Sequence, residues 1–127
     1  MFYHYIIKLY PKMKNQDYLE IVKNAMWRVV NEKRVGTASH MKKVGDIEYA
    51  GKTGTAQVYN LDKGKTGTKN LQDHALFISY APFDKPEVVF TVIVEHGGGG
   101  SSTAAPIARD IIEYYMNNKT QKVAINE

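Results

Sequence analysis

Residues 74–95 read HALFISYAPFDKPEVVFTVIVE, and this stretch decides the fold. It holds two runs, 74–81 and 87–95, that are rich in the Val, Ile, Phe and Tyr residues favoured in β-strands. The link PFDKP between them contains two prolines and an aspartate, which is typical of a short turn between antiparallel strands. Because VVFTVIV is nearly continuous in its apolar character, we expect the second run to be a central strand covered on both faces.

Upstream of this stretch, the sequence predicts a third strand at 47–59 and a helix before it. In IEYAGKTGTAQVY, Thr, Val and Tyr alternate around a glycine-rich middle. The preceding YLEIVKNAMWRVV has apolar residues at helical spacing. Asp17 and Glu20 have the spacing of a capping box at the start of this helix, and Gly36 is expected just beyond its end.

A second helix is expected after the flexible corner HGGGGSST. Ser102 or Thr103 can cap it, and Pro106 is tolerated in its first turn. Its expected buried face consists of apolar residues at helical spacing: Ile107, Ala108, Ile111, Ile112 and Tyr115. The order helix, three strands, helix predicts an α+β fold, an antiparallel sheet of about three strands with helices packed on it.

Length and composition limit the class of protein. A chain with 43% hydrophobic and 24% charged residues suits one globular unit over 1–127, with an unplaced lead at 1–14 and a tail at 119–127 that we expect to fray. The longest apolar runs are a few residues long, which argues against a membrane span, and MFYHYIIKLY lacks the basic region and cleavage site of a signal peptide. Without cysteine, disulfide and thiolate chemistry are excluded.

The stretch YAGKTGTAQVYN in the first strand carries the strongest signal of a binding site. Strand interiors favour Val, Ile and Thr, so Lys52 needs a reason to be there. Gly51 and Gly54 beside it remove side chains and let a ligand or another backbone approach closely. Thr53 and Thr55 add two hydroxyls on one face of a regular strand, opposite the face of Lys52, unless a glycine bulge intervenes. An ammonium, two hydroxyls and exposed N–H groups suit an anion such as a carboxylate.

A phosphate-binding loop fits neither of the two KTGT copies. The motif G-x-x-x-x-G-K-[ST] needs a glycine where the sequence has Asp46 for the first copy and Tyr59 for the second. The second copy, Lys65–Thr68, lies in a polar, lysine-rich loop with no strand pattern around it. We interpret it as a coincidence of composition, with a mobile loop that borders the cleft as the alternative.

The segments YAGKTGTAQV and DHALFISYAPFDKPEVVFTVIVEHGGGGSSTAAPIARDIIEYY resemble the C-terminal part of the transpeptidase domain of the penicillin-binding protein 2 family, the class B, elongation type of the penicillin-recognising serine enzymes. Upstream, YLEIVKNAMWRVVNE and GTA resemble the helix before that strand, so the resemblance spans about residues 17–118. It implies a fragment of the β-lactamase/transpeptidase-like fold. It also implies a parent that cross-links peptidoglycan stem peptides through a serine ester, is acylated by β-lactams, needs no metal or organic cofactor, and acts at the periplasmic face of the inner membrane.

The same resemblance implies roles for four residues of the first strand. Lys52 would bind the carboxylate of the substrate or antibiotic and assist proton transfer. Thr53 and Thr55 would offer hydroxyls to that carboxylate, and Gly54 would keep the strand edge open for the acyl donor. The backbone N–H of Thr55 would supply one half of an oxyanion hole, so Lys52 and Thr55 are the implied catalytic residues.

The family also needs a Ser-x-x-Lys at the start of a buried helix and a Ser-x-Asn on a loop, both upstream of this strand. No serine of the chain has an asparagine two residues on. A Ser-x-x-Lys occurs at Ser39 and Lys42, but it lies between a helix end and a strand, where we expect a connecting loop. We therefore expect the chain to be inactive alone.

Two other functions remain open. One is a non-catalytic module that self-associates or binds a partner through an exposed sheet edge. The other is a polyanion binder that uses the lysines of 63–69, although a net charge of +4 is mild and no nucleic-acid recognition motif is present.

Gly97–Gly100 either cradles an anion or needs unusual backbone angles. His4, His40, His74 and His96 show no metal-ligand spacing, and we expect the strand-end histidines to be structural.

Overall fold

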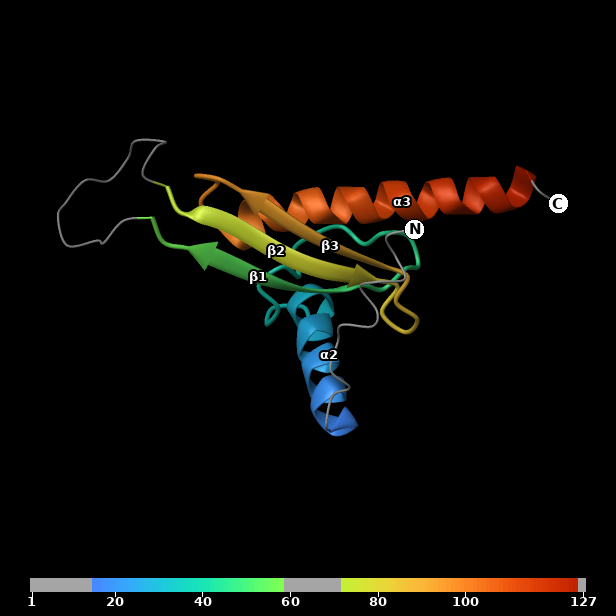
Figure 1. Cartoon of the computed structure of the whole chain (residues 1–127), viewed down its shortest axis with the longest axis horizontal. Coiled ribbons are helices and arrows are strands. Elements are labelled where there is room, and N and C mark those ends of the chain that lie inside the picture. Colours follow the sequence, from blue (N-terminus) through green and yellow to red (C-terminus); the bar gives the residue numbers. More distant parts are fainter. Residues whose placement is uncertain (1–14, 59–71, 126–127) are drawn as a thin grey trace, which may run out of the picture.

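The computed structural model describes residues 15–58 and 72–125 and places three strands in one antiparallel sheet (Figure 1). The order across the sheet is β1-β2-β3, with β1 at Ala50–Ala56, β2 at His74–Ala81 and β3 at Val88–Val94. The pairing of β1 is continuous, from Ala50 opposite Tyr80 to Ala56 opposite His74. The expected α+β layout of a three-stranded sheet with two helices is confirmed.

Helix α3 (Ala105–Ile125) lies along one face of the sheet, directly after a short π-helical turn, η4 (Gly100–Ala104) (Figure 1). Small buried residues form the start of this contact, which lets the helix backbone approach the strands: Ala104, Ala105 and Ala108. Alternate residues of β2 are buried in the same layer: Ala75, Phe77, Ser79 and Ala81. Ile112 and Met116 continue this core along the helix.

The opposite face of the sheet is exposed on β3. Val89 is 65% exposed and Ile93 is 62% exposed, and β3 is the last strand of the described sheet. The expectation of a central strand covered on both faces was therefore wrong for this part of the chain. A continuous apolar run indicates that a strand is suited to burial on both faces, but it does not say which segment would cover it.

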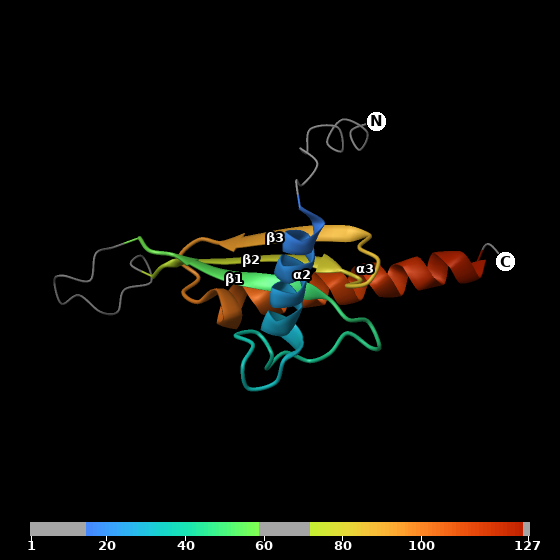
Figure 2. The same ribbon diagram turned by 90° about the horizontal axis from the view of Figure 1, so that it is seen from below.

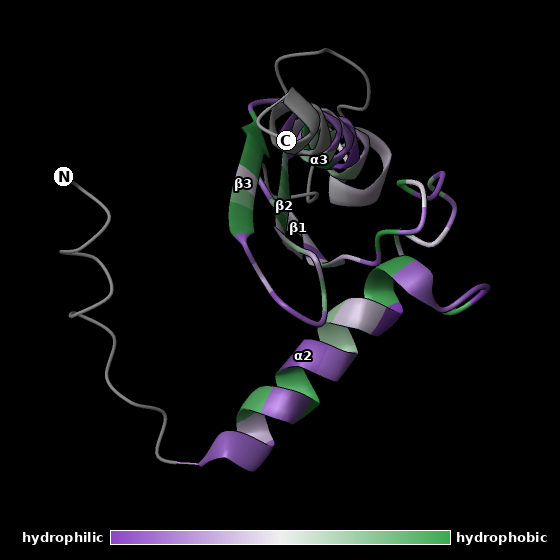
Figure 3. Cartoon of the chain, turned by 90° about the vertical axis from the view of Figure 1, so that its right-hand side faces the viewer, coloured by the Kyte–Doolittle hydropathy of each residue, from purple (hydrophilic) through white to green (hydrophobic). Residues whose placement is uncertain are grey.

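Helix α2 (Gln16–Asn31) lies on the side of the sheet opposite α3 (Figures 1 and 2). Its C-terminal end meets β1, and its N-terminal end is directed away from the sheet (Figure 3). The side chain of Asn15, the N-cap, accepts a hydrogen bond of 2.9 Å from the N–H of Asp17, while Glu20 pairs with Lys23. The predicted capping box was wrong because a strong N-cap residue stands two positions before Asp17.

The end of α2 also differs from the prediction. The helix stops at Asn31, and the N–H of Glu32 closes its last turn on the carbonyl of Arg28. Gly36 lies in the turn that follows and donates its N–H to the carbonyl of Glu32 at 2.9 Å. Gly36 therefore shapes the exit loop instead of ending the helix.

Neither Ser102 nor Thr103 caps α3 as we expected. The hydroxyl of Ser102 donates to the carbonyl of Gly99 at 3.1 Å, and the hydroxyl of Thr103 donates to the carbonyl of Gly97 at 2.7 Å. Both hydroxyls thus close the glycine-rich turn, and the helix begins through η4. The reason is local: serine and threonine bond nearby backbone groups as readily in a turn as at a helix start.

The predicted buried face of α3 was correct for Ala108 and Ile112 and wrong for three residues that are 37–41% exposed: Ile107, Ile111 and Tyr115. The helix contacts the sheet along a narrow stripe, so its flanks stay open. The helix continues to Ile125, and Lys119 forms an ion pair with Glu87. Within the described ranges, no helix is long and apolar enough to cross a membrane.

Candidate functional site

The lysine–threonine–glycine sequence lies on β1, at an edge of the described sheet. Its register places Lys52 opposite Ile78 and Thr53 opposite Phe77. Ile78 is exposed and Phe77 is buried, so Lys52 and Thr53 belong to opposite faces of the sheet. The pairing contains no bulge, and the predicted alternation therefore holds, with Thr55 on the face of Thr53.

Lys52 is exposed at this edge. Its Nζ donates to the carbonyl of Thr53 at 2.6 Å, and no ion pair of Lys52 is found within 15–58 and 72–119. Thr55, three positions along the strand, is exposed as well. Because no carboxylate of the described residues pairs with this ammonium, it can attract an incoming anion, which makes this edge a candidate anion-binding site.

Thr37 adds a residue to the site that sequence reasoning missed. Its hydroxyl lies 3.1 Å from the hydroxyl of Thr53. Thr37 belongs to the loop between α2 and β1, and this loop is held by the N–H of Ala38, which donates to the carbonyl of Val29 at 2.9 Å. The GTA tripeptide at 36–38 was the only part of the sequence that pointed to Thr37, through its resemblance to the family. Nothing in its composition predicts that it lies beside the strand.

Gly51 and Gly54 have different roles, although we expected both to open the strand to a ligand or to another backbone. A Cβ on Gly51 would lie 2.8 Å from Cε1 of Phe77 and 3.0 Å from the carbonyl of Ile78, with Cζ of Phe77 closer still. Gly51 therefore makes room for the Phe77 ring in the core. The backbone of Gly54 does lie against Gly100, but the glycine that permits this approach is Gly100, because a Cβ on Gly54 would meet Cβ of Leu76 instead, at 3.3 Å.

The entry into β1 is fixed by α2 and by a buried tyrosine. The side-chain amide of Asn31 donates to the carbonyl of Tyr49 at 2.9 Å. Tyr49 itself is only 2% exposed, and this burial raises the pKa of its phenol to about 12, against the smaller opposing effect of Arg109. The strand therefore starts from a buried residue whose carbonyl is hydrogen-bonded to α2.

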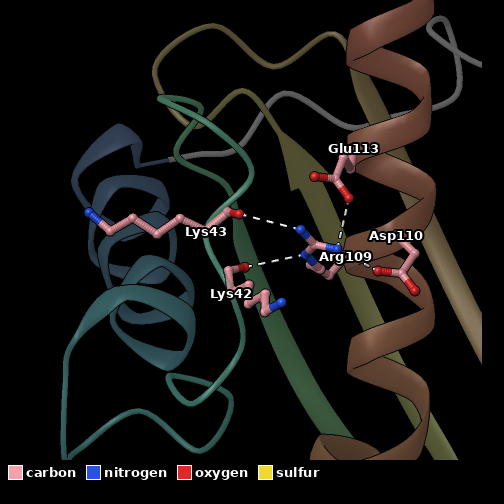
Figure 4. Close-up of polar contacts among 5 residues, drawn as sticks. All are labelled: Lys42, Lys43, Arg109, Asp110 and Glu113. Atoms are coloured by element: carbon pink, nitrogen blue, oxygen red, sulfur yellow. Dashed lines mark hydrogen bonds and ion pairs between the residues drawn. The ribbon is translucent and has the colours of Figure 1, made fainter.

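Arg109 of α3 holds the loop before β1 (Figure 4). Its guanidinium donates to the carbonyls of Lys42 and Lys43 at 3.3 and 3.4 Å. It also pairs with Asp110 at 2.7 Å and Glu113 at 2.8 Å. The hydrogen bond that its guanidinium donates to Asp110, supported by the charge of Glu113, raises the pKa of Arg109. One side chain thus connects α3 to the loop that carries Thr37.

The Ser39–Lys42 pair lies in this same loop, as predicted. Both residues line a surface pocket of about 230 Å³ between α2 and the loop. Lys42 is exposed, and its carbonyl is the acceptor for Arg109. In the described part of the chain, no hydrogen bond joins the two side chains, so they do not form a nucleophile–base pair there.

Two histidines close the sheet at the end of β1. The N–H of His96 donates to Nδ1 of His74 at 2.9 Å, and Nδ1 of His96 lies 3.1 Å from the carbonyl of Gln72. These contacts confirm the prediction that the strand-end histidines are structural. Over the described ranges, no group of three or more His, Cys, Asp or Glu residues could hold a metal ion. The second KTGT copy, at 65–68, lies outside the described residues.

A strand that carries a lysine–threonine–glycine sequence thus lies at the edge of the described antiparallel sheet, with helix α3 behind the sheet. The family model of the penicillin binding protein transpeptidase domain matches residues 12–113, and the chain belongs to this family. Among curated relatives, the peptidoglycan D,D-transpeptidase MrdA of Haemophilus influenzae is 43% identical over 124 residues, which are 91% of this chain and 19% of the relative.

Solved structures of penicillin-binding protein 2 have a similar fold. The protein from Pseudomonas aeruginosa, in complex with WCK 5153, superimposes with a TM-score of 0.65 at 32% identity, over 80% of this chain and 20% of that one. The protein from Helicobacter pylori, in complex with MreC, gives a TM-score of 0.61 at 31% identity, over 84% and 18%. The chain therefore spans about one fifth of the length of the relatives it matches.

Proposed function

We propose that this chain provides the carboxylate-binding strand of a peptidoglycan D,D-transpeptidase of the penicillin-binding protein 2 type. The observation that carries the proposal is the exposed ammonium of Lys52 on a sheet edge, bonded to a carbonyl and, in the described residues, to no carboxylate. A peptidoglycan stem peptide and a β-lactam both present a carboxylate to such an edge. Charge-assisted hydrogen bonds of this kind are stronger than neutral ones.

Each residue of the strand has a part in this proposal. Lys52 binds the carboxylate and assists proton transfer. The hydroxyls of Thr53 and Thr55 bind the same carboxylate, and Thr37 directs the hydroxyl of Thr53 through their 3.1 Å contact. Gly54 leaves the edge flat for the acyl donor, and the N–H of Thr55 stabilises the oxyanion that develops in the tetrahedral state. Because β1 is an edge strand, groups from both of its faces can reach one ligand.

The acyl bond would form on a serine that this chain does not supply. The chain has no Ser-x-Asn, and Ser39 has no base bonded to it in the described residues. We therefore propose that the chain is inactive alone. We also propose that it works as the C-terminal segment of a parent transpeptidase domain at the periplasmic face of the inner membrane.

Reversible binding tests the carboxylate site. The chain is titrated by NMR with an acetylated peptide that ends in D-Ala-D-Ala, and with the same peptide amidated at its C-terminus. We expect the free acid to shift the amides of β1 and the amide peptide to leave them unchanged. Lys52→Gln should remove this binding, and Lys85→Gln, an exposed lysine of the β2–β3 turn, should keep it. Equal shifts from both peptides would refute the proposal.

Labelling with a fluorescent penicillin tests whether the chain lacks the serine nucleophile that forms the acyl bond. On a denaturing gel we expect no covalent label on the wild-type chain or on Ser39→Ala. A label that is present on the wild type and lost in Ser39→Ala would identify Ser39 as a nucleophile. That result would overturn the proposal that the chain is inactive alone, while leaving the carboxylate site to the titration.

A second candidate function is self-association or partner binding through the sheet edge. The observation in its favour is the exposure of Val89 and Ile93 on β3, the last strand of the described sheet. Exposed strands of this kind pair readily with other chains unless a charge interrupts them. Light scattering should show a mass that rises with concentration in the wild type and stays monomeric in Ile93→Lys. A wild-type monomer at high concentration would exclude this function.

A further inference from the structure

We infer that Gly100 is a positioning residue for β1, because it sets the place of the Gly54 backbone and of the adjacent N–H of Thr55. The sequence left the four-glycine run open between an anion cradle and a loop with unusual backbone angles. Of its members, Gly98 needs such an angle, with φ +78°. Gly100 does not need such an angle, and its contact is with the strand that carries the candidate site. The effect of Gly100 on activity rests on the proposed function, whereas its contact with Gly54 does not.

Gly100 lies directly against the backbone of two paired strands. A Cβ at this position would be 2.5 Å from the carbonyl oxygen of Leu76 and 3.0 Å from the nitrogen of Gly54, with the carbonyl oxygen of Gly54 closer still. All three neighbours are backbone atoms, so no side chain could rotate away to admit even one methyl group. Gly100 is also buried.

The register of the sheet explains why this place is available. Gly54 pairs with Leu76, whose side chain is only partly buried, whereas its neighbours Ala75 and Phe77 are buried toward α3. Side chains alternate along a strand, so at this pair the backbone is bare on the α3 side. Gly54 adds no side chain to either face. The start of η4 fills the space, and glycine is the residue that fits it.

The glycine run cannot move back to relieve a clash, because hydrogen bonds hold it on both sides of Gly100. The N–H of Gly98 donates to the carbonyl of Asp73 at 2.8 Å. Thr103 bonds the run twice, with its N–H to the carbonyl of Gly99 at 3.0 Å and its hydroxyl to the carbonyl of Gly97 at 2.7 Å. An added side chain at position 100 would therefore push β1 outward at Gly54.

The size of that movement matters for the site. Restoring ordinary van der Waals distance requires a displacement on the order of 1 Å, and misplacement of a reacting group by that amount costs about 100-fold in rate. The displaced atoms include the N–H of Thr55 and the strand edge beside Lys52. Gly100 touches neither substrate nor reacting atoms in this proposal, and it acts only through the position of Gly54.

The test compares Gly100→Ala with Gly99→Ala. Gly99 has an ordinary φ of −89°, and the nearest atom to its added Cβ would be the movable hydroxyl of Ser102 at 2.9 Å, so this variant is the matched control. In amide NMR spectra we expect Gly100→Ala to shift Gly54 and Thr55 while Thr91 on β3 stays in place. We expect Gly99→Ala to leave all three unchanged. Unchanged Gly54 and Thr55 signals in a folded Gly100→Ala would overturn the inference.

If Gly100→Ala does not fold, Thr103→Val decides the question. It removes the hydroxyl bond to Gly97 without adding bulk, and we expect hydrogen exchange to rise at Gly54 and Thr55 and to stay unchanged at Thr91. Unchanged exchange at all three would overturn the inference.

Titration with the D-Ala-D-Ala peptide separates the two proposals. If the wild type binds the peptide and the variant that displaces β1 binds it at least tenfold more weakly, both the carboxylate site and the role of Gly100 are supported. Absence of wild-type binding counts against the carboxylate site alone, since the NMR shifts still decide the role of Gly100.

Discussion

Gly51→Ala offers the sharpest test of how β1 is built, because the structure assigns this glycine to the core and not to the ligand. The new methyl group would lie within 3.0 Å of two atoms of the Phe77 ring, and Phe77 is 1% exposed. Overpacking of a filled core costs about 1–3 kcal/mol. For a chain of 127 residues this corresponds to a fall in Tm of about 4–11 °C.

A double-mutant cycle isolates the cause. Phe77→Leu removes the ring and destabilises the chain by itself, but it also removes the atoms that Gly51→Ala would meet. We expect the double variant to be more stable than the sum of the single effects by about 1 kcal/mol or more. Urea denaturation followed by circular dichroism gives the four free energies of unfolding.

Two results would refute this reasoning. Additive costs, within about 0.5 kcal/mol, would show that Gly51 and Phe77 do not compete for space. A stable Gly51→Ala chain that no longer binds the D-Ala-D-Ala peptide would show that Gly51 faces the ligand after all. The control is Gly45→Ala, where no atom lies within 4 Å of the added Cβ but φ is +54°, so any loss there comes from backbone strain.

Three other predictions test the packing around the strand. Burial raises the pKa of Tyr49 to about 12. The contribution of its neutral phenol to the free energy of unfolding is therefore complete below pH 10 and is lost as pH rises to 12. Relative to Tyr49→Phe, the wild type should lose about 1.4 kcal/mol between pH 8 and pH 11 in urea denaturation, and a constant difference would contradict this. Arg109→Met should lower the free energy of unfolding by about 1 kcal/mol, measured the same way, and should speed hydrogen exchange in the 36–43 loop. Ala108→Leu should cost about 1–3 kcal/mol by thermal unfolding, whereas Ile107→Leu, on the exposed flank, should change Tm little.

Local patterns were sufficient to predict the sheet. The prolines of PFDKP and the apolar runs beside them predicted the β2–β3 hairpin, and the continuous register of β1 agrees with the expected alternation of Lys52 and Thr53. Helix ends were predicted less well. Several cap residues compete within a few positions there, and Asn15 instead of Asp17 accepts the first N–H.

Contacts between distant segments were beyond the reach of the sequence. The hydroxyl of Thr37 lies beside that of Thr53 because hydrogen bonds of Ala38 and Arg109 hold the loop in place. The sequence of this loop has no periodicity from which the contact could be predicted. Gly51 and Gly54 look alike in the sequence, yet a Cβ on Gly51 would collide with the Phe77 ring, whereas a Cβ on Gly54 would lie 3.3 Å from Cβ of Leu76. The exposure of β3 depends on which segments lie beside it, and no pattern within VVFTVIV carries that information.

The way in which Arg109 binds the 42–43 loop has a consequence for how the chain can vary. Its guanidinium binds the main-chain carbonyls of Lys42 and Lys43, and the side chains of both lysines are exposed. Main-chain acceptors survive most substitutions, so the two lysines are free to change in related sequences while the loop keeps its path. Arg109 has no such freedom, because a lysine could not reach both carbonyls with the same planar fork. The path of the loop before β1 is therefore encoded on the helix that follows the sheet.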